Sequence, residues 1–130
     1  MPSEISQAAA RVRVGRLAAD QHGVFHLDQA LGLGMSRDAV YRSCRKGEWR
    51  RLLHKVFATA AARWQWPMVA CLWGGSGSAT SHRCAGELWE LDGVPSGFVE
   101  ITRIGTSLMS NSKVIVHRAS SSVPSQRVDG

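Results

Sequence analysis

Basic side chains that can neutralise phosphates are concentrated in one stretch of this chain, residues 37–55. Seven arginines and lysines lie there beside two carboxylates, which gives a net charge of +5 over 19 residues, against +6 for all 130 residues. Such side chains displace the counterions of a phosphate backbone, and arginine also forms two parallel hydrogen bonds with guanine. A positive charge this local indicates a docking surface for a polyanion.

Local sequence signals place this charge on a helix-turn-helix. Residues 27–33 predict a two-turn helix, a Gly-containing turn follows, and Ser36 can cap a second helix over residues 37–46 that ends at Gly47. The inward side chains of the two-turn helix are expected to be Leu27, Ala30 and Leu31. On a helical wheel the second helix has one basic side and one small, mostly apolar side. The side expected to face the core consists of Ala39, Val40, Ser43 and Cys44.

A helix before this motif and a hairpin after it complete a winged helix-turn-helix. Residues 5–20 predict the first helix, and residues 49–53 and 55–58 predict two short strands joined by a tight turn. The apolar positions of the first helix are Ile5, Ala8, Ala9, Val12, Leu17 and Ala18, and its solvated side is expected to carry Arg11, Arg13 and Arg16. The hairpin is expected to turn Trp49, Leu52, Val56 and Phe57 towards the core.

DNA is the polyanion that this order of elements favours. The second helix is expected to contact base edges or nearby phosphates, and the hairpin to contact the backbone or the minor groove. The helix candidates are Arg37, Tyr41, Arg42 and Arg45, and the hairpin candidates are Arg50, Arg51, His54 and Lys55. The alternative is a basic face that is merely solvated. It is less favoured because a basic helix and a basic hairpin follow each other in the correct order.

The second half of the chain predicts a small α/β module, which the sequence does not show to be complete. Helices are expected over residues 64–73 and 82–91, and strands over residues 79–81, 98–104 and 113–118. Its expected core includes Ala85, Leu88 and the four tryptophans Trp64, Trp66, Trp73 and Trp89. The fold class is therefore α+β. The expected domains are residues 1–58 (winged helix-turn-helix), 59–63 (linker), 64–118 (α/β module) and 119–130 (disordered tail).

No catalytic or metal-binding constellation emerges from the sequence, and we expect neither an enzyme nor a cofactor. His82, Cys84 and Glu87 match no structural zinc spacing. Glu100 on its strand has no partner carboxylate and is expected to be exposed. The three cysteines are widely spaced and odd in number, which argues against a disulfide framework and favours the cytoplasm. No apolar stretch approaches the roughly 20 residues that span a membrane, and no signal peptide is evident.

Several motifs carry a resemblance to a known family. They are LAADQHGVF at 17–25, ALGLGMSRDAV at 30–40, GEWRRL at 47–52 and VFA at 56–58. Together they resemble the N-terminal domain of AbiEi-family antitoxins, which belong to type IV toxin–antitoxin (abortive infection) systems. ATSHRCA at 79–85 and VIVHR at 114–118 resemble the module that follows in many actinobacterial members. Relatives continue beyond residue 130 into further helices and an endonuclease-like domain, so this chain resembles a truncated or short member.

The resemblance implies a bacterial repressor that binds operator DNA and controls its own operon. It implies contacts from Ser36 to Lys46 and from the hairpin, which adds Ser36 and Lys46 to the candidates. The implied partners are double-stranded DNA and a nucleotidyltransferase-type toxin that is neutralised without a stable complex. Winged helices often bind as homodimers, but the sequence contains no evident dimerisation element. Two alternatives stay open: a protein-interaction module, and a non-catalytic N-terminal remnant of an endonuclease fusion.

Overall fold

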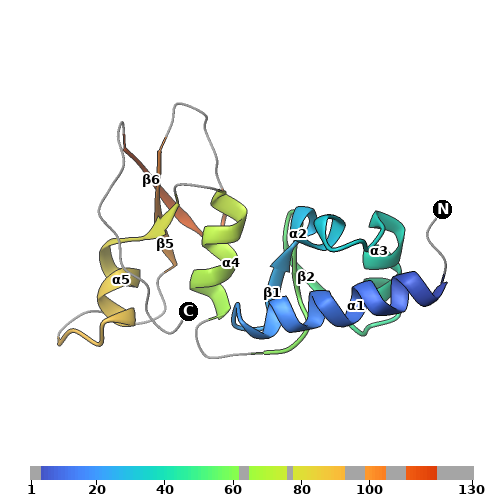
Figure 1. Ribbon diagram of the computed structural model, residues 1–130. Helices are drawn as coiled ribbons and strands as arrows, with labels where there is room; N and C mark the ends of the chain where they lie inside the picture. Colours follow the sequence, from blue (N-terminus) through green and yellow to red (C-terminus); the bar gives the residue numbers. More distant parts are fainter. Residues whose placement is uncertain (1–3, 62–64, 76–77, 93–98, 105–110, 120–130) are drawn as a thin grey trace. The chain divides into compact units, whose positions relative to one another are not determined.

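The chain forms two compact units, Met1–Gln65 and Trp66–Gly130 (Figure 1). The computed structural model describes residues 4–61, 65–75, 78–92, 99–104 and 111–119. Both units contain helices and a small sheet, which confirms the α+β class. The tail predicted from residue 119 lies outside the described residues from 120 onwards, as does Trp64.

The first unit has the element order of a winged helix. Its elements are α1 (Glu4–Ala19), β1 (Val24–His26), α2 (Leu27–Gly32), α3 (Arg37–Arg45), β2 (Arg50–Leu53) and β3 (Val56–Ala58). The strands form one antiparallel sheet in the order β1-β3-β2. The central strand β3 pairs Phe57 with Phe25 of β1, and β2 and β3 form the predicted hairpin. The helix-turn-helix and its wing are therefore both present, as the sequence predicted.

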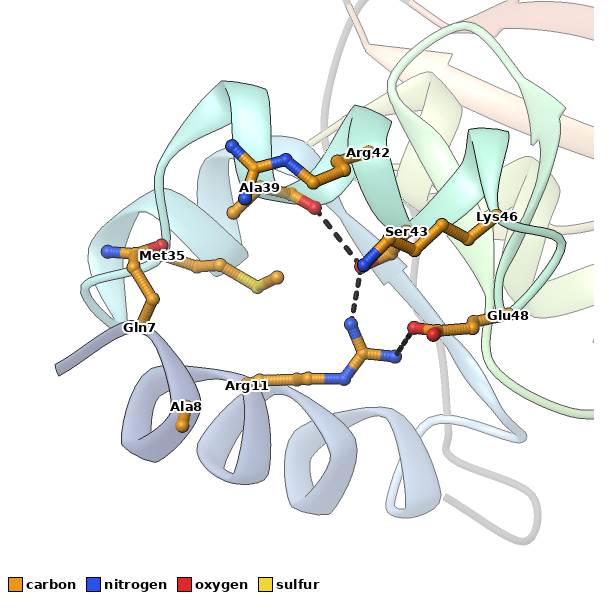
Figure 2. Close-up of a pocket in the computed structure, with 9 residues that line it drawn as sticks. All are labelled: Gln7, Ala8, Arg11, Met35, Ala39, Arg42, Ser43, Lys46 and Glu48. Atoms are coloured by element: carbon orange, nitrogen blue, oxygen red, sulfur yellow. Dashed lines mark hydrogen bonds and ion pairs between the residues drawn. The ribbon is translucent and has the colours of Figure 1, made fainter. Parts of the chain in front are cut away.

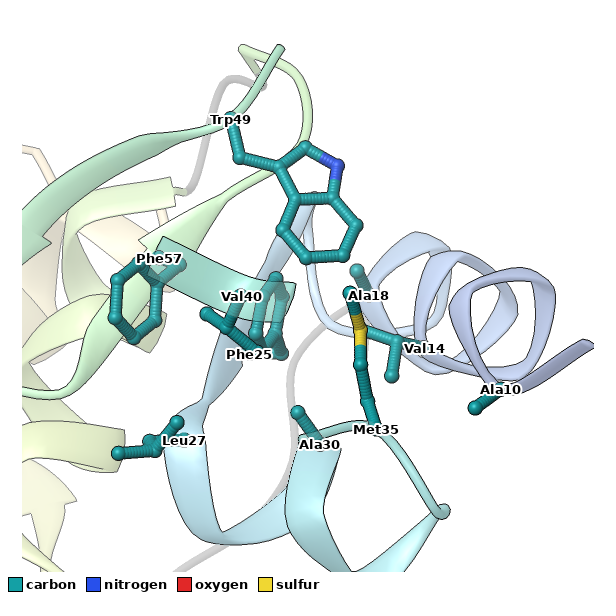
Figure 3. Packing of buried hydrophobic residues seen from close by; sticks show 10 residues of the cluster. All are labelled: Ala10, Val14, Ala18, Phe25, Leu27, Ala30, Met35, Val40, Trp49 and Phe57. Atoms are coloured by element: carbon teal, nitrogen blue, oxygen red, sulfur yellow. The ribbon is translucent and has the colours of Figure 1, made fainter. Parts of the chain in front are cut away.

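Aromatic rings of the sheet form the centre of this unit (Figure 3). Phe25 stacks on Phe57 with ring centroids 5.5 Å apart, and Trp49 meets Phe25 edge-on at 5.0 Å. Val40 of α3 is fully buried in the same cluster. Trp49 is only 6% exposed, so the prediction that it packs the wing against the helices is confirmed.

Hydrogen bonds of Ser36 fix the turn of the helix-turn-helix. The Ser36 hydroxyl accepts from the Ala39 amide at 3.2 Å, which confirms the predicted cap. The Ser36 amide in turn donates to the Gln7 side chain of α1 at 2.9 Å. Gly47, at φ 78°, follows α3 in the left-handed region that glycine adopts without strain.

Several predictions of which side chains face inward were wrong in this unit. The buried side of α1 consists of Ala10, Val14 and Ala18, whereas Val12 is 54% exposed. Apolar residues lie on every side of α1, so their spacing did not identify the packed side. In α2, Leu31 is exposed. On the wing Leu53 is buried and Leu52 only half-buried, because the β2–β3 register shifts between Arg51 and Leu53.

The second unit contains a mixed sheet with two helices. Its elements are α4 (Gln65–Gly74), β4 (Ala79–Thr80), α5 (His82–Leu88), β5 (Glu100–Ile104) and β6 (Ile115–Ala119). The strand order is β4-β5-β6, antiparallel for the first pair and parallel for the second. On the central strand Ile101 is fully buried. The predicted helices and strands are therefore present; α4 is shifted by one residue, and the other elements are shorter than expected.

Two expectations for the second unit were wrong. In α5 the buried residues are Cys84 and Gly86, while Trp89 just beyond it is 52% exposed. Glu100, expected to be exposed, is only 1% exposed. Its carboxylate accepts from Arg83 Nε at 2.6 Å and pairs with His117 Nε2 at 2.9 Å. The hydrogen bond from Arg83 outweighs burial and lowers the Glu100 pKa to about 2.

The start of α2 contains a titratable cap and yields a pH prediction. His26 Nδ1 accepts from the Asp28 amide at 3.0 Å, and the His26 amide donates to the Gln29 side chain. Burial lowers the His26 pKa below 6.5; Asp28 opposes this shift, and Lys55 and His54 reinforce it. A protonated Nδ1 has no lone pair to offer the amide, so the cap needs the neutral ring.

The cap is expected to stabilise the unit above pH 6.5, the unfolded value, and to be lost as pH falls through the lower folded pKa. Urea unfolding between about pH 7.5 and pH 5 measures this loss. His26→Asn keeps an N-cap that does not titrate in this range, so it should be less sensitive to pH. Equal pH dependence of the two proteins would refute the role of His26.

Candidate nucleic-acid interface

The outer side of α3 carries four exposed cations. Val40 and Ser43 face the core, while Asp38 is exposed with the cations. The exposed basic residues are Arg37, Arg42, Arg45 and Lys46. At 100° per residue they all lie within about half of the helix circumference. The sequence-based division of this helix is therefore confirmed, with Ala39 and Cys44 half-buried at the edge of the core.

Two of the candidates on this helix also have structural contacts. The Tyr41 ring is half-buried and meets Phe57 edge-on, with centroids 5.5 Å apart and planes at 85°. The hydroxyl of Ser36 accepts from the Ala39 amide as the helix cap. Tyr41 therefore packs α3 on the sheet and Ser36 stabilises the start of α3, besides lying where the sequence predicted contacts with DNA.

The hairpin presents its cations beside those of α3. Arg50, Arg51 and His54 are exposed, and Lys55 is half-buried at the turn with φ 60°. The Lys55 carbonyl accepts from the Leu27 amide at 2.8 Å, so the turn is tied to the start of α2.

Backbone hydrogen bonds join the end of α3 to the start of the hairpin. The Glu48 and Trp49 amides both donate to the Ser43 carbonyl, at 3.0 and 3.3 Å, so β2 begins beside the end of α3. Burial raises the pKa of the Cys44 thiol, and the charges of Arg51 and then Arg45 act in the opposite direction. We call the basic residues of the two segments the helix–wing surface: Arg37, Arg42, Arg45, Lys46, Arg50, Arg51, His54 and Lys55.

The side chain of Arg11 joins α1 to the base of this surface (Figure 2). Its guanidinium donates to the Ser43 hydroxyl in α3 and to Glu48 Oε2 at 2.6 Å. It also lies over the Trp49 ring, with Cζ 4.4 Å from the centroid. Arg11 therefore contacts the end of α3 and the start of the wing at once, and it neutralises one of the two carboxylates in residues 37–55.

The prediction that the arginines of α1 lie on a solvated side is confirmed for Arg13 and Arg16, which are exposed, whereas Arg11 is half-buried. Besides Arg11, Arg13 donates from Nε and from its terminal nitrogen to the Leu33 carbonyl, at 3.1 and 2.9 Å. Arg16 is exposed, as expected. No local signal distinguishes these three arginines, because their partners are 20 to 37 residues away in sequence.

A small cavity lies between α1 and α3, with Arg42 and Lys46 among the residues that line it (Figure 2). Its volume of about 140 Å³ is well below the roughly 300–1,000 Å³ of typical small-molecule sites. This cavity is therefore too small for an organic effector of ordinary size.

Comparison with known proteins agrees with this geometry. Residues 13–59 match the family model described as "Transcriptional regulator, AbiEi antitoxin", a span that contains α2, α3 and the wing. Most of the first unit is therefore similar to an AbiEi antitoxin domain. No curated protein matches the chain. In the described residues, no helix is both long and apolar enough to cross a bilayer.

The Arg11 contacts yield a stability prediction for the first unit. Replacing Arg11 by Met keeps an apolar stem over Trp49 but removes the guanidinium. The ion pair with Glu48 is exposed and contributes little, so the loss comes mainly from the ring contact and the Ser43 hydrogen bond. We expect the free energy of unfolding to fall by about 1–2 kcal/mol, measured by urea denaturation.

Arg16→Met is the matched control for this experiment, because Arg16 is an exposed arginine of the same helix. Its effect should stay within about 0.5 kcal/mol. Equal destabilisation by both substitutions would show that the loss reflects helix propensity or net charge, and would contradict the role assigned to Arg11.

Proposed function

We propose that the first unit binds operator DNA with α3 in the major groove and the β2–β3 hairpin on the backbone or in the minor groove. We further propose that the protein thereby represses its own operon in a type IV toxin–antitoxin system. The AbiEi antitoxin family is a family of transcriptional regulators, which supports the general role. The observation that carries the proposal is a helix with exposed cations whose end is hydrogen-bonded to the start of a hairpin that also carries exposed cations, through the Ser43 carbonyl.

The chemistry of this surface suits DNA in two ways. Its cations supply sequence-independent affinity by releasing counterions, and the arginines of α3 can read guanine in the major groove. Arg42 and Arg45 lie in the last turn of α3, and His54 and Lys55 lie at the tip of the hairpin. We infer base contacts for the helix and mainly phosphate contacts for the hairpin.

The antitoxin role implies a toxin as the second partner. We propose a nucleotidyltransferase-type toxin that is neutralised without a stable complex, and a homodimer as the DNA-bound form. In this proposal residues 1–58 bind DNA, residues 59–63 link the two parts, and residues 64–118 serve the antitoxin role.

Fluorescence anisotropy of the full chain against its own upstream DNA tests the proposal. A scrambled duplex of equal length is the control, and both titrations are repeated over a salt series. Specific binding should be about 10³-fold or more tighter than binding to the scramble, and affinity should fall steeply with salt. Equal weak affinity for both duplexes would reject an operator-binding repressor.

A charge reversal on α3 provides the sharpest test of the interface. Arg45→Glu should weaken specific binding by at least tenfold, because it removes a donor and introduces a charge that repels phosphate. Arg16→Glu changes the net charge equally at an exposed position of α1, so it should have a much smaller effect. Circular dichroism checks that both variants fold. Equal losses would mean that net charge alone determines the affinity.

The hairpin is expected to respond differently from the helix. Arg50→Ala should weaken binding to the upstream duplex and to the scramble by similar factors, because a phosphate contact carries no sequence information. The slope of log affinity against log salt should fall by about one. A loss confined to the specific duplex would instead assign Arg50 to base recognition.

One observation favours the alternative of a protein-interaction module. Trp89 and Leu91 are 52% and 60% exposed in the second unit. Large exposed apolar side chains often mark contact sites between proteins. Co-expression of the full chain with the neighbouring toxin gene, compared with the Trp89→Ser variant, tests it. Growth rescue that is lost in the variant while DNA binding persists would support this second role.

A further inference from the structure

The second unit brings two imidazoles and a buried carboxylate together. His82 begins α5, Glu100 begins β5 and His117 lies in the middle of β6. One ligand atom from each of the three lies within 4.8 Å of the other two. Spacing along the chain groups His82 with Cys84 and Glu87. The fold instead pairs His82 with residues 18 and 35 positions further on.

Backbone pairing explains why these three side chains meet. The Ser81 amide donates to the Glu100 carbonyl at 3.0 Å, which places the start of α5 beside β5. On the parallel strand β6, His117 is in register with Thr102, two residues beyond Glu100. Side chains two apart on a strand share a face, so His117 and Glu100 project from the same side of the sheet. The opposite side carries Ile101.

We propose that His82, Glu100 and His117 bind one divalent transition-metal ion of the zinc class. Two imidazole nitrogens and one carboxylate oxygen are a donor set that Zn²⁺ accepts, with a water in the fourth position. Tetrahedral bonds of about 2.1 Å place ligand atoms about 3.4 Å apart. His117 Nε2 and Glu100 Oε2 are already 2.9 Å apart, and the exposed His82 can move to close the site.

The surroundings of the three ligands resemble the outer shell of a metal site. Arg83 Nε donates to Glu100 Oε1 at 2.6 Å. This bond orients the carboxylate, and its other oxygen, Oε2, lies beside His117 Nε2. The Ser81 hydroxyl makes no cap bond to α5 and lies 3.0 Å from His82 Nδ1. Metal-binding imidazoles and carboxylates are commonly oriented by such hydrogen bonds. The positive charge of Arg83 should moderate the affinity.

The conformation of His82 supports the same assignment. Its φ of 54° lies in the left-handed region, which non-glycine residues seldom adopt and which is enriched at functional sites. The His82 ring stacks on that of His117, with centroids 3.8 Å apart, so the exposed His82 side chain has to rotate to aim a nitrogen at an ion shared with His117. His117 is 37% exposed and His82 is exposed, so an ion can enter from solvent while the carboxylate stays buried.

A bound ion would tie α5, β5 and β6 to one another, since each contributes one ligand. Binding to the folded state alone stabilises that state by mass action. The alternative is that Arg83, Glu100 and His117 form only a structural ion-pair group. In that case added metal should neither bind stoichiometrically nor raise the melting temperature.

The test uses the full chain, stripped with a chelator and titrated with Zn²⁺ in competition with a chromophoric chelator. We expect one Zn²⁺ per chain, a melting temperature that rises with Zn²⁺, and a tetrahedral visible spectrum when Co²⁺ replaces it. His82→Asn should weaken Zn²⁺ binding by about 10- to 100-fold or more, as should His117→Ala.

The control is His22→Asn in the first unit. His22 also has a positive φ, 59°, and Asn tolerates that conformation, so both Asn variants remove an imidazole at matched backbone geometry. Because His82 is exposed, its variant should fold even if changes at the buried Glu100 do not. The absence of stoichiometric Zn²⁺ binding by the natural chain would overturn the proposal. Unchanged affinity in His82→Asn, or an equal loss in His22→Asn, would overturn it too.

Discussion

The guanidinium of Arg11 lies where α1, the end of α3 and the start of the wing meet. Each of its contacts is modest alone, because the ion pair with Glu48 is exposed and the Trp49 contact is a single cation–π interaction. They matter together because all of them are made by the same guanidinium group. The bond to Ser43 fixes the rotation of α3 about its axis, while Glu48 and Trp49 fix the start of the hairpin. The basic side of the helix and the basic hairpin are therefore oriented by the same side chain.

The same contact changes the charge of the outer surface. Residues 37–55 contain two carboxylates, Asp38 and Glu48. Asp38 lies in the first turn of α3, where it interacts favourably with the helix dipole, and Glu48 is paired with a cation from α1. Because Glu48 is paired with Arg11, the local sum of +5 understates the positive charge available outside, while Asp38 stays exposed among the cations. A stable fold and a positive outer surface are compatible here because both carboxylates make stabilising interactions within the first unit.

Local signals explain which parts of the fold the sequence predicted. The cap at Ser36, the stop at Gly47 and the two-sided pattern of α3 depend on neighbours within one or two turns, so α3 was predicted almost to the residue. The buried side of α1 was not, because apolar residues surround the helix and only its partners select the side that packs. The burial of Leu53 depends on a register shift between β2 and β3 that the residue pattern of the strand does not predict.

Glu100 shows the limit of such reasoning most clearly. Its partners Arg83 and His117 each lie 17 positions away, one before and one after it. A buried carboxylate is costly to desolvate and is tolerated only when its partners are in place. The fold of the second unit therefore has to bring α5, β5 and β6 together before this charge can be buried. A single side chain thus connects three segments that have no common signal in the sequence. The same arrangement places Glu100 beside both His82 and His117.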